Sequence, residues 1–422
     1  MDFQITENTR LREKICYYRH PTGLDIFVAP KKGYASQYAI FGTKYGSIDN
    51  RFEYGGKVTK VPEGIAHFLE HKLFESEDGD AFSRYAKTGA SANAYTSFDR
   101  TCYLFSSTER FRDSLEILLD FVQHPYFTEK TVSKEQGIIG QEIRMYDDSP
   151  GWRVLFNLLG CLYHTHPVKI DIAGTVESIS HITADLLYEC YHAFYNLNNM
   201  VLSVAGDVDP DEIAATADRL LKPSHPALVR SLFEEEPDAI VRTKAEQKLA
   251  VSVPLFNFGF KDTPSSGIEA ARMETSTDIL LDVIAGDGSS LYRRLYDEGL
   301  INSTFGAEYF SGRSFAATIV AGESREPEKV MEAFLETVRH LKENGIPAQD
   351  FERAKKSVYG RLAAAFDSVD NVANVIAACR FMEMSPFDAV EAAASLTLDD
   401  AQQRLAAHFS PEKAALSVIR PL

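Results

Sequence analysis

The chain contains one strand-like segment twice, as NMVLSVAGDVD (residues 199–209) and as KAALSVIRPL (residues 413–422). Each copy closes a run of strands and helices that follow one another in the same order. The predicted strands, rich in β-branched and aromatic residues, span residues 23–30, 37–49, 91–98, 100–107, 249–261, 301–312 and 314–322. The predicted helices span residues 64–76, 110–124, 128–147, 181–195, 273–284, 327–342 and 350–367. A repeat of about 200 residues is far too long for a solenoid unit, so it predicts a duplicated domain.

The order of the elements predicts the fold class. Strands come in adjacent pairs and helices follow in blocks, which favours an α+β fold over a doubly wound parallel sheet. We predict two homologous domains, each an antiparallel-rich sheet with helices packed on one face. Their predicted ranges are 1–222 and 247–422, joined by a linker over 223–246 that carries several prolines and the acidic run Glu234–Glu236. The acidic run predicts a solvated segment, and His164 and His166 are expected to be ordinary loop residues.

Composition narrows the class of protein. The length of 422 residues suits two domains, and the net charge of −17 argues against nucleic acid or an anionic membrane surface as a partner. Five scattered cysteines without a CxxC pair suggest neither a disulfide framework nor a cysteine zinc site. No segment has the length and apolarity of a signal peptide or a membrane span. We therefore expect a soluble cytoplasmic protein.

The motif HFLEH at residues 67–71 is the sharpest chemical feature of the sequence. Two residues four apart on a helix share a face, so His67 and His71 could offer two imidazoles to one metal ion. Glu70 lies one turn after His67, on nearly the same face, where its carboxylate could act on a water molecule. This is the inverted zinc-peptidase pattern HxxEH. The alternative interpretation, a helix with two surface histidines, is disfavoured by the small and apolar residues around the motif.

A second helix carries two glutamates seven residues apart. A catalytic zinc site has three protein ligands and an open position, so one more ligand is needed. Glu135 and Glu142 lie two helical turns apart and project from one face, and Glu142 is the strongest candidate for the third ligand. Glu135 would then support the ligands from outside. Gly137 and Gly140 lie between them and predict the close approach of another helix. Without the histidine motif, an exposed acidic helix face would be equally compatible with this segment.

Together these motifs resemble the pitrilysin/insulinase family of zinc metallopeptidases, which includes the mitochondrial processing peptidases. The matching elements are HFLEH, the segment SANAYTS at residues 91–97, the paired glutamates and the duplicated α+β halves, so the resemblance covers essentially the whole chain. It implies one Zn²⁺ per chain. By the resemblance, the metal ligands are His67, His71 and Glu142, and the general base is Glu70. The resemblance also implies that Glu135 supports the ligands and that Asn93, Ala94 and Tyr95 form a strand edge that pairs with the substrate.

The resemblance also implies an activity. It predicts a zinc endopeptidase that hydrolyses short unfolded peptides or peptide precursors inside an enclosed two-half chamber. The alternative is a catalytically silent peptide-binding or assembly subunit of the same family. Silent members have usually lost one or more of the key residues, whereas this sequence keeps them.

One segment departs from the family pattern. Family members carry an Arg and a Tyr, which bind the peptide near the zinc, in a stretch that resembles residues 289–302 here. In this chain Tyr296 stands where the Arg is expected, no Tyr follows Leu300 at the expected spacing, and Arg293 and Arg294 are displaced. We therefore expect a heterodimer with a homologous chain that lacks zinc ligands but keeps the Arg and Tyr. A homodimer is the alternative.

Overall fold

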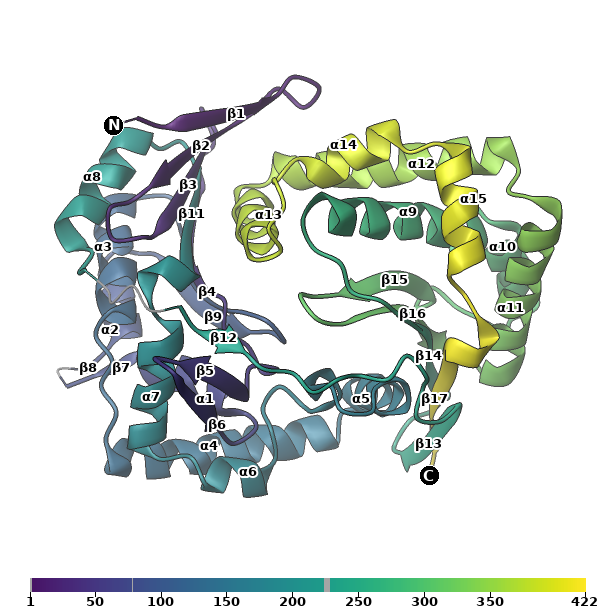
Figure 1. Cartoon of the computed structure of the whole chain (residues 1–422), viewed down its shortest axis with the longest axis horizontal. Helices are drawn as coiled ribbons and strands as arrows, with labels where there is room; N and C mark the ends of the chain where they lie inside the picture. The colour runs from purple at the N-terminus through teal and green to yellow at the C-terminus, as the bar shows by residue number, and fades with distance from the viewer. Residues whose placement is uncertain (1, 78, 224–227) are drawn as a thin grey trace. The chain divides into compact units, whose positions relative to one another are not determined.

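The computed structural model describes residues 2–77, 79–223 and 228–422, which divide into two compact units (Figure 1). Unit 1 comprises Met1–Ile143, Asp171–Phe233 and Ala364–Phe381, and unit 2 comprises Arg144–Ile170, Glu234–Ala363 and Met382–Leu422. Each unit thus includes a short piece from the other half of the chain. The predicted domains 1–222 and 247–422 were drawn from the duplication of the sequence, and they stay a prediction. Residues 224–227 of the predicted linker 223–246 lie outside the described residues.

Unit 1 is built on a seven-stranded mixed sheet. Its strands, in spatial order, are β1 (Gln4–Asn8), β2 (Glu13–Arg19), β3 (Asp25–Pro30), β11 (Met200–Gly206), β4 (Gln37–Thr43), β10 (Thr101–Ser107) and β9 (Ser91–Thr96). Strand β11, the first copy of the repeated segment, is buried along its whole length and runs parallel to β3 and antiparallel to β4. Short strands form two small additional sheets: β12 (Arg230–Ser231), β5 (Arg51–Tyr54) and β6 (Lys57–Lys60) form one, and β7 (Glu75–Ser76) and β8 (Gly79–Asp80) form the other.

Unit 2 repeats five of those strands in the same arrangement. Its sheet has the order β13 (Lys244–Leu249), β17 (Ala414–Pro421), β14 (Leu255–Asp262), β16 (Ala316–Glu323) and β15 (Gly306–Ser311). Strand β17, the second copy of the repeated segment, is parallel to β13 and antiparallel to β14, as β11 is to β3 and β4. The matching order and directions confirm the predicted α+β class with mostly antiparallel sheets.

Helices surround the sheets and connect their strands. In unit 1 they are α1 (Ile65–Leu73), α2 (Ala81–Ala86), α3 (Phe111–Val122), α4 (Glu129–Asp147, which continues into unit 2), α6 (Val176–Ser180), α7 (Ala184–Phe194), α8 (Pro210–Leu220) and α13 (Val369–Phe381). In unit 2 they are α5 (Pro150–Leu162), α9 (Gly267–Ala285), α10 (Ser290–Asp297), α11 (Pro327–Asn344), α12 (Ala348–Ala364), α14 (Asp388–Ser395) and α15 (Leu398–Ala407). Short 3₁₀ helices lie at Pro167–Lys169, Leu197–Asn199, Ala365–Asp367 and Pro411–Lys413.

Side-chain alternation along the strands shows which helices cover which face of the unit 1 sheet. Tyr103 of β10 packs against Phe121 of α3, with ring centroids 5.7 Å apart. The preceding residue, Cys102, points to the other face and pairs with Gly42 of β4. A Cβ on Gly42 would lie 3.1 Å from the ring of Phe381, the last residue of α13. A main helix layer therefore covers one face, as predicted, and α13 from the second half of the chain covers part of the other.

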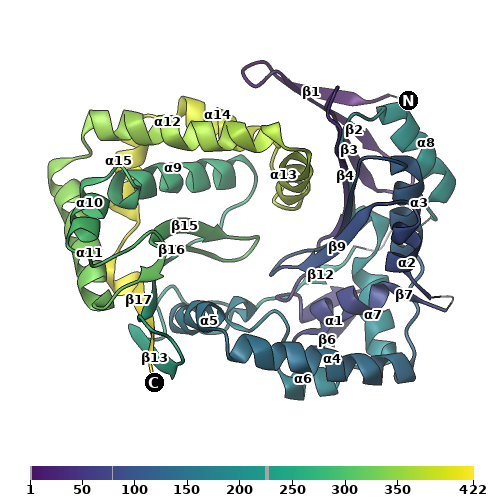
Figure 2. The same ribbon diagram turned by 180° about the vertical axis from the view of Figure 1, so that it is seen from behind.

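Unit 2 has the reciprocal arrangement. Phe258 of β14 packs against Phe334 of α11, with ring centroids 5.2 Å apart. Its neighbour Gly259 points to the opposite face, where a Cβ would lie 3.1 Å from Leu158 of α5. Figure 1 shows α5 beside β14 and β17, which it contacts, and Figure 2 shows α5 near β17 from behind. Helix α5, from the first half of the chain, thus packs on the sheet of unit 2, and helix α13, from the second half, packs on the sheet of unit 1.

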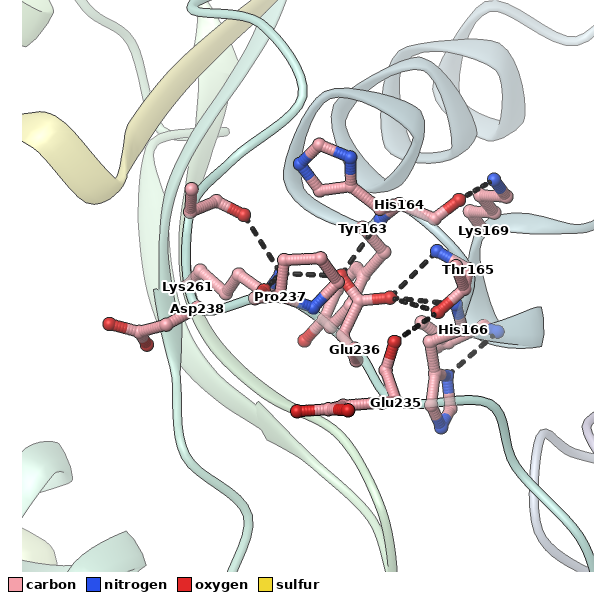
Figure 3. Close-up of polar contacts among 12 residues, drawn as sticks. Tyr163, His164, Thr165, His166, Lys169, Glu235, Glu236, Pro237, Asp238 and Lys261 are labelled. Atoms are coloured by element: carbon pink, nitrogen blue, oxygen red, sulfur yellow. Dashed lines mark hydrogen bonds and ion pairs between the residues drawn. The ribbon is translucent and has the colours of Figure 1, made fainter.

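The acidic run Glu234–Glu236 is anchored within unit 2 by its last residue, Glu236. Glu234 and Glu235 are exposed, but the Glu236 carboxylate accepts hydrogen bonds from the backbone N–H groups of residues 164, 165 and 166 at 2.7–2.8 Å (Figure 3). The buried Lys261 ammonium lies 2.5 Å from the same carboxylate. These contacts hold the pKa of Glu236 at about 2 despite burial, which would raise it. The prediction of a solvated segment was wrong for Glu236, because the 163–170 loop offers it backbone donors.

Among the described residues, no single helix is long and apolar enough to cross a membrane. One bent pair, Ala348–Asp367 with Val369–Phe381, reaches the required length and composition only when both helices are counted together.

Candidate metal centre

Helix α1 is held in place by its first turn and by its apolar face. Gly64, which precedes the helix, has a φ of 86°, and a Cβ there would lie 2.2 Å from the carbonyl oxygen of Ala173. Only glycine fits this left-handed position against a neighbouring backbone. Phe68 and Leu69 are fully buried, and α1 packs against β9 and β10. The start and the rotation of the helix that carries HFLEH are therefore fixed.

The structure brings His67, His71 and Glu142 together. The Nε2 atom of His67 lies 3.7 Å from one Glu142 carboxylate oxygen, and the Nε2 atom of His71 lies 3.6 Å from the other. The two imidazole rings have centroids 4.6 Å apart. One donor atom from each residue lies within 4.8 Å of the others. Two helices, α1 and α4, thus converge on a common point with two nitrogens and one carboxylate.

Glu135 orients one of these histidines from behind. Its carboxylate lies 3.0 Å from Nδ1 of His71, so the Nδ1–H donates to it and the Nε2 atom is directed toward Glu142. Glu135 is buried, and burial would raise its pKa, but the hydrogen bond from His71 lowers it overall. A carboxylate on the outer nitrogen is the usual partner of a metal-binding histidine, because it fixes the tautomer and the ring orientation.

The two histidines differ in their affinity for protons. Burial, together with the neighbouring His71, lowers the pKa of His67 to about 4. Burial also acts to lower the pKa of His71, but the hydrogen bond to Glu135 and the nearby carboxylates of Glu70 and Glu142 raise it overall. His67 is therefore neutral at physiological pH and ready to bind a metal, whereas His71 holds its proton more tightly than an ordinary imidazole does.

This donor set fits zinc. Two imidazoles and one carboxylate are a known ligand combination of catalytic zinc sites, which keep the fourth position open. Within the described part of the chain, Nδ1 of His67 is buried without a hydrogen-bond partner. Each donor residue is partly or fully buried, with His67 only 9% exposed. Partly or fully buried nitrogen and oxygen donors that meet from two helices are suited to holding a divalent ion.

Glu70 lies on α1 between the two histidines and contacts the sheet. The Oγ1 hydroxyl of Thr96, the last residue of β9, donates a hydrogen bond of 2.7 Å to Oε2 of Glu70. Burial raises the pKa of Glu70, while this hydrogen bond and the nearby His71 act in the opposite direction. Glu70 is thus a buried carboxylate beside the donor set, as a general base requires.

Asn93, Ala94 and Tyr95 lie on β9, the edge strand of the unit 1 sheet. Asn93 is exposed, and its side-chain oxygen accepts a hydrogen bond from the Ala94 N–H at 2.9 Å. The Tyr95 hydroxyl lies 3.2 Å from Oδ1 of Asn374 on α13. Within the described ranges β9 pairs with β10 alone, which leaves its other edge free for a further strand.

Two contacts of this site do not follow from the motifs. Thr96 lies inside the segment SANAYTS, and the alternation of side chains along a strand places it on the same face as Ala94. That alternation was the signal from which the sequence could have identified Thr96. Asn374 has no such signal, because it comes from α13 in the other half of the chain. The prediction that Gly137 admits another helix was wrong: a Cβ there would have no neighbour within 4 Å among the described residues outside its own helix.

The segment that departs from the family pattern forms α10 and its surroundings. Arg293, Arg294 and Tyr296 are all exposed on this helix, and Tyr296 is 53% exposed. The ring of Tyr296 stacks on that of Tyr292 at a centroid distance of 6.0 Å. Within unit 2, these side chains therefore form a solvated helix face.

Comparison with known proteins agrees with this geometry. The family model described as insulinase (peptidase family M16) matches residues 59–176, and the model described as peptidase M16 inactive domain matches residues 181–358. The uncharacterized zinc protease YmfH of Bacillus subtilis (strain 168) is 44% identical over 98% of both chains. A second zinc protease of that organism, YmxG, is 27% identical over 75% of this chain and 78% of its own.

Solved structures extend the comparison to the fold. The crystal structure of an M16-like peptidase from Alicyclobacillus acidocaldarius covers 100% of this chain and 99% of its own, with a TM-score of 0.94 and 35% identity. Pitrilysin matches at 18% identity and a TM-score of 0.77, which shows the fold alone, and this chain spans 46% of it. Since a relative 44% identical matches nearly the whole chain and the His/His/Glu group is assembled in the structure, the chain belongs to the M16 (insulinase/pitrilysin) family of zinc metalloproteases.

Proposed function

We propose that this chain is the catalytic half of an endopeptidase that cleaves short unfolded peptides or peptide precursors, with one zinc held by His67, His71 and Glu142. The observation that carries the proposal is the convergence of these three donors beside a buried Glu70, next to an edge strand. A protein that only binds or assembles peptides would have no need for this combination of a metal site and a base.

Glu70 is the proposed general base. Zinc, when bound, polarises a peptide carbonyl and makes water more acidic. The Glu70 carboxylate takes a proton from the attacking water and passes it to the nitrogen of the leaving amine as the C–N bond breaks. Glu135 keeps His71 in the tautomer that binds metal.

Strand β9 is the proposed substrate platform. An extended peptide would add to its free edge as a further strand, through main-chain hydrogen bonds that do not depend on sequence. Asn93, Ala94 and Tyr95 would contact this peptide, and the Tyr95–Asn374 contact would hold the strand from the other face. Such binding suits unfolded peptides, because a folded protein offers few free extended segments.

A second chain completes the proposed enzyme. Tyr296, where family members carry a substrate-binding Arg, is exposed on α10, and this chain spans about half of pitrilysin. A homologous chain that lacks zinc ligands but keeps the Arg and Tyr would supply the missing contacts, with a homodimer as the alternative. The proposed compartment is the cytoplasm, where the five buried cysteines would stay reduced.

The test is a pair of substitutions at neighbouring positions of α1. Glu70→Gln removes the base but no metal ligand, so it should keep about one zinc per chain and lose peptide cleavage by roughly a factor of 10³ or more. His67→Ala removes a ligand and should lose both zinc and activity. Zinc content by mass spectrometry and cleavage of a fluorogenic peptide library separate the two effects.

Two results would contradict the proposal. Near-normal cleavage by the Glu70→Gln variant would exclude Glu70 as the base. A purified chain that binds well under one zinc even after zinc addition would instead favour a catalytically silent assembly subunit.

A further inference from the structure

The contact between Thr96 and Glu70 has a direction that its chemistry fixes. A carboxylate can only accept hydrogen bonds, whereas a threonine hydroxyl carries one hydrogen to donate. The 2.7 Å distance between Thr96 Oγ1 and Glu70 Oε2 therefore describes a bond in which Thr96 donates. Within the described part of the chain, Thr96 is the one hydrogen-bond donor to this carboxylate.

A second threonine holds Thr96 in the sheet. Thr101 of β10 is the register partner of Thr96 and is fully buried. Its hydroxyl lies 2.9 Å from the carbonyl oxygen of Tyr45 and 3.4 Å from the hydroxyl of Thr96. The carbonyl can only accept, so Thr101 gives its hydrogen to Tyr45 and leaves the Thr96 hydrogen free for Glu70. Thr96, the donor to Glu70, thus lies on β9 at a position that is paired with β10.

Glu70 needs such a donor because of its length. A glutamate side chain has three rotatable torsions, and its helix fixes only the first of its carbons. The bond from Thr96 fixes one carboxylate oxygen, Oε2, and among the described residues no hydrogen-bond donor contacts the other oxygen, Oε1.

We propose that Thr96 is a positioning residue, which anchors Oε2 of Glu70 so that Oε1 takes the proton from water. This inference rests on the proposed function, because it gives Glu70 the role of base. The proton passes from water to Oε1 and then to the leaving amine nitrogen as the C–N bond breaks, so the carboxylate is regenerated while Oε2 keeps its hydrogen bond. Thr96 itself neither gains nor loses a proton in this sequence.

The experiment compares three threonine substitutions. Thr96→Val keeps the shape of the side chain and removes the hydroxyl, whereas Thr96→Ser keeps the hydroxyl. Thr43→Val is the matched control: Thr43 of β4 is paired with Thr101, is fully buried, and donates to the carbonyl of Phe194 rather than to the site. All are assayed on a fluorogenic peptide in the assembly in which the wild-type chain is active, with zinc content measured in parallel.

The expected result is a loss in turnover alone. Thr96→Val should lower kcat by about 10- to 100-fold, the cost of losing a hydrogen bond to a charged group, while KM and zinc content stay within about twofold. Thr96→Ser should stay within about threefold of the wild type in kcat, and Thr43→Val should leave kcat unchanged. Equal losses in the Val and Ser variants, or a loss seen only in KM, would overturn the positioning role.

A second readout is independent of turnover. In the zinc-free chain, a double-mutant cycle of Thr96→Val with Glu70→Met should show that the two changes are coupled by about tenfold in the unfolding equilibrium constant. Additive effects would show that the hydrogen bond is absent, and would overturn the inference even if turnover falls. If the zinc-loaded wild type cleaves no peptide, the proposed function fails and the positioning role with it, whatever the coupling.

Discussion

His71 is the proposed zinc ligand at which protons and metal should compete most directly. Its pKa lies above the ordinary value of 6.5, because Glu135, Glu70 and Glu142 outweigh the effect of burial, whereas that of His67 is about 4. Zinc binds the neutral imidazole, so protons compete with the metal at His71 at a higher pH than at His67.

We expect the zinc affinity to depend on one proton. As the pH falls below the raised pKa of His71, the affinity should drop by about tenfold per pH unit, and the dependence should steepen only near pH 4, where His67 also takes up a proton. Competition titrations with a chromogenic chelator between pH 5 and 8 measure this slope. A drop of about a hundredfold per unit over that range would mean that both histidines are protonated in the metal-free chain.

The Glu135→Gln variant tests the origin of this behaviour. Without the carboxylate, the pKa of His71 should fall, which moves the onset of the decline to lower pH, and the affinity above that onset should be about 10- to 100-fold weaker because the ring is less well oriented. Asp148→Asn, which removes an exposed carboxylate just beyond the end of α4, is the control for net charge. An unchanged pH profile in Glu135→Gln would exclude Glu135 as the cause.

At the scale of elements, the space around two glycines shows where the elements pack closely and where they do not. A Cβ on Gly42 of β4 would lie 2.9 Å from Cys102 and 3.1 Å from Phe381, but one on Gly137 of α4 would meet nothing within 4 Å among the described residues beyond its own helix. Gly42→Ala should therefore lower the free energy of unfolding by about 1–3 kcal/mol through overpacking. Gly137→Ala should raise it by about 0.5–1 kcal/mol through helix propensity. Urea unfolding measures both, and the same sign for both would contradict the assignment of α13 to the sheet of unit 1.

The segment around Glu236 should stabilise unit 2 in a way that depends on pH. The pKa of Glu236 is about 2, below the ordinary 4.5, so its contribution is complete above pH 4.5 and is lost as the pH falls toward 2. Glu236→Gln leaves the buried Lys261 without its counter-charge and should cost about 3 kcal/mol at pH 7. The exposed neighbour in Glu235→Gln should be neutral. Urea unfolding at pH 7 and pH 3 checks the prediction, which fails if Glu236→Gln costs the same at both.

The helices that carry the motifs and the central strands of both sheets follow from the sequence, but the packing of a helix from one half of the chain on the sheet built by the other half does not. Helices α1 and α4 were predicted from periodicity and motif, and the repeated closing segment predicted β11 and β17. Helices α5 and α13 are absent from the predicted elements, although they pack on the sheets of units 2 and 1. Periodicity shows that a helix has an apolar face, but not which sheet covers it, because that choice depends on contacts between residues far apart in the chain. The Tyr95–Asn374 contact was unpredictable for the same reason.

At the scale of the whole molecule, the prediction concerns the proposed second chain. The proposed second chain would supply the substrate contacts that the family's Arg makes, since Tyr296 stands at that position here and is exposed. The prediction is that the zinc-loaded chain alone cleaves peptides at least about tenfold more slowly than the same chain co-expressed with a half-length homologue from its own genome that lacks HxxEH, since lost substrate contacts reduce kcat and not binding alone. Peptide assays and native mass spectrometry of both preparations test this. A stable homodimer with full activity would identify the partner as a second copy, and an active monomer would show that this chain needs none.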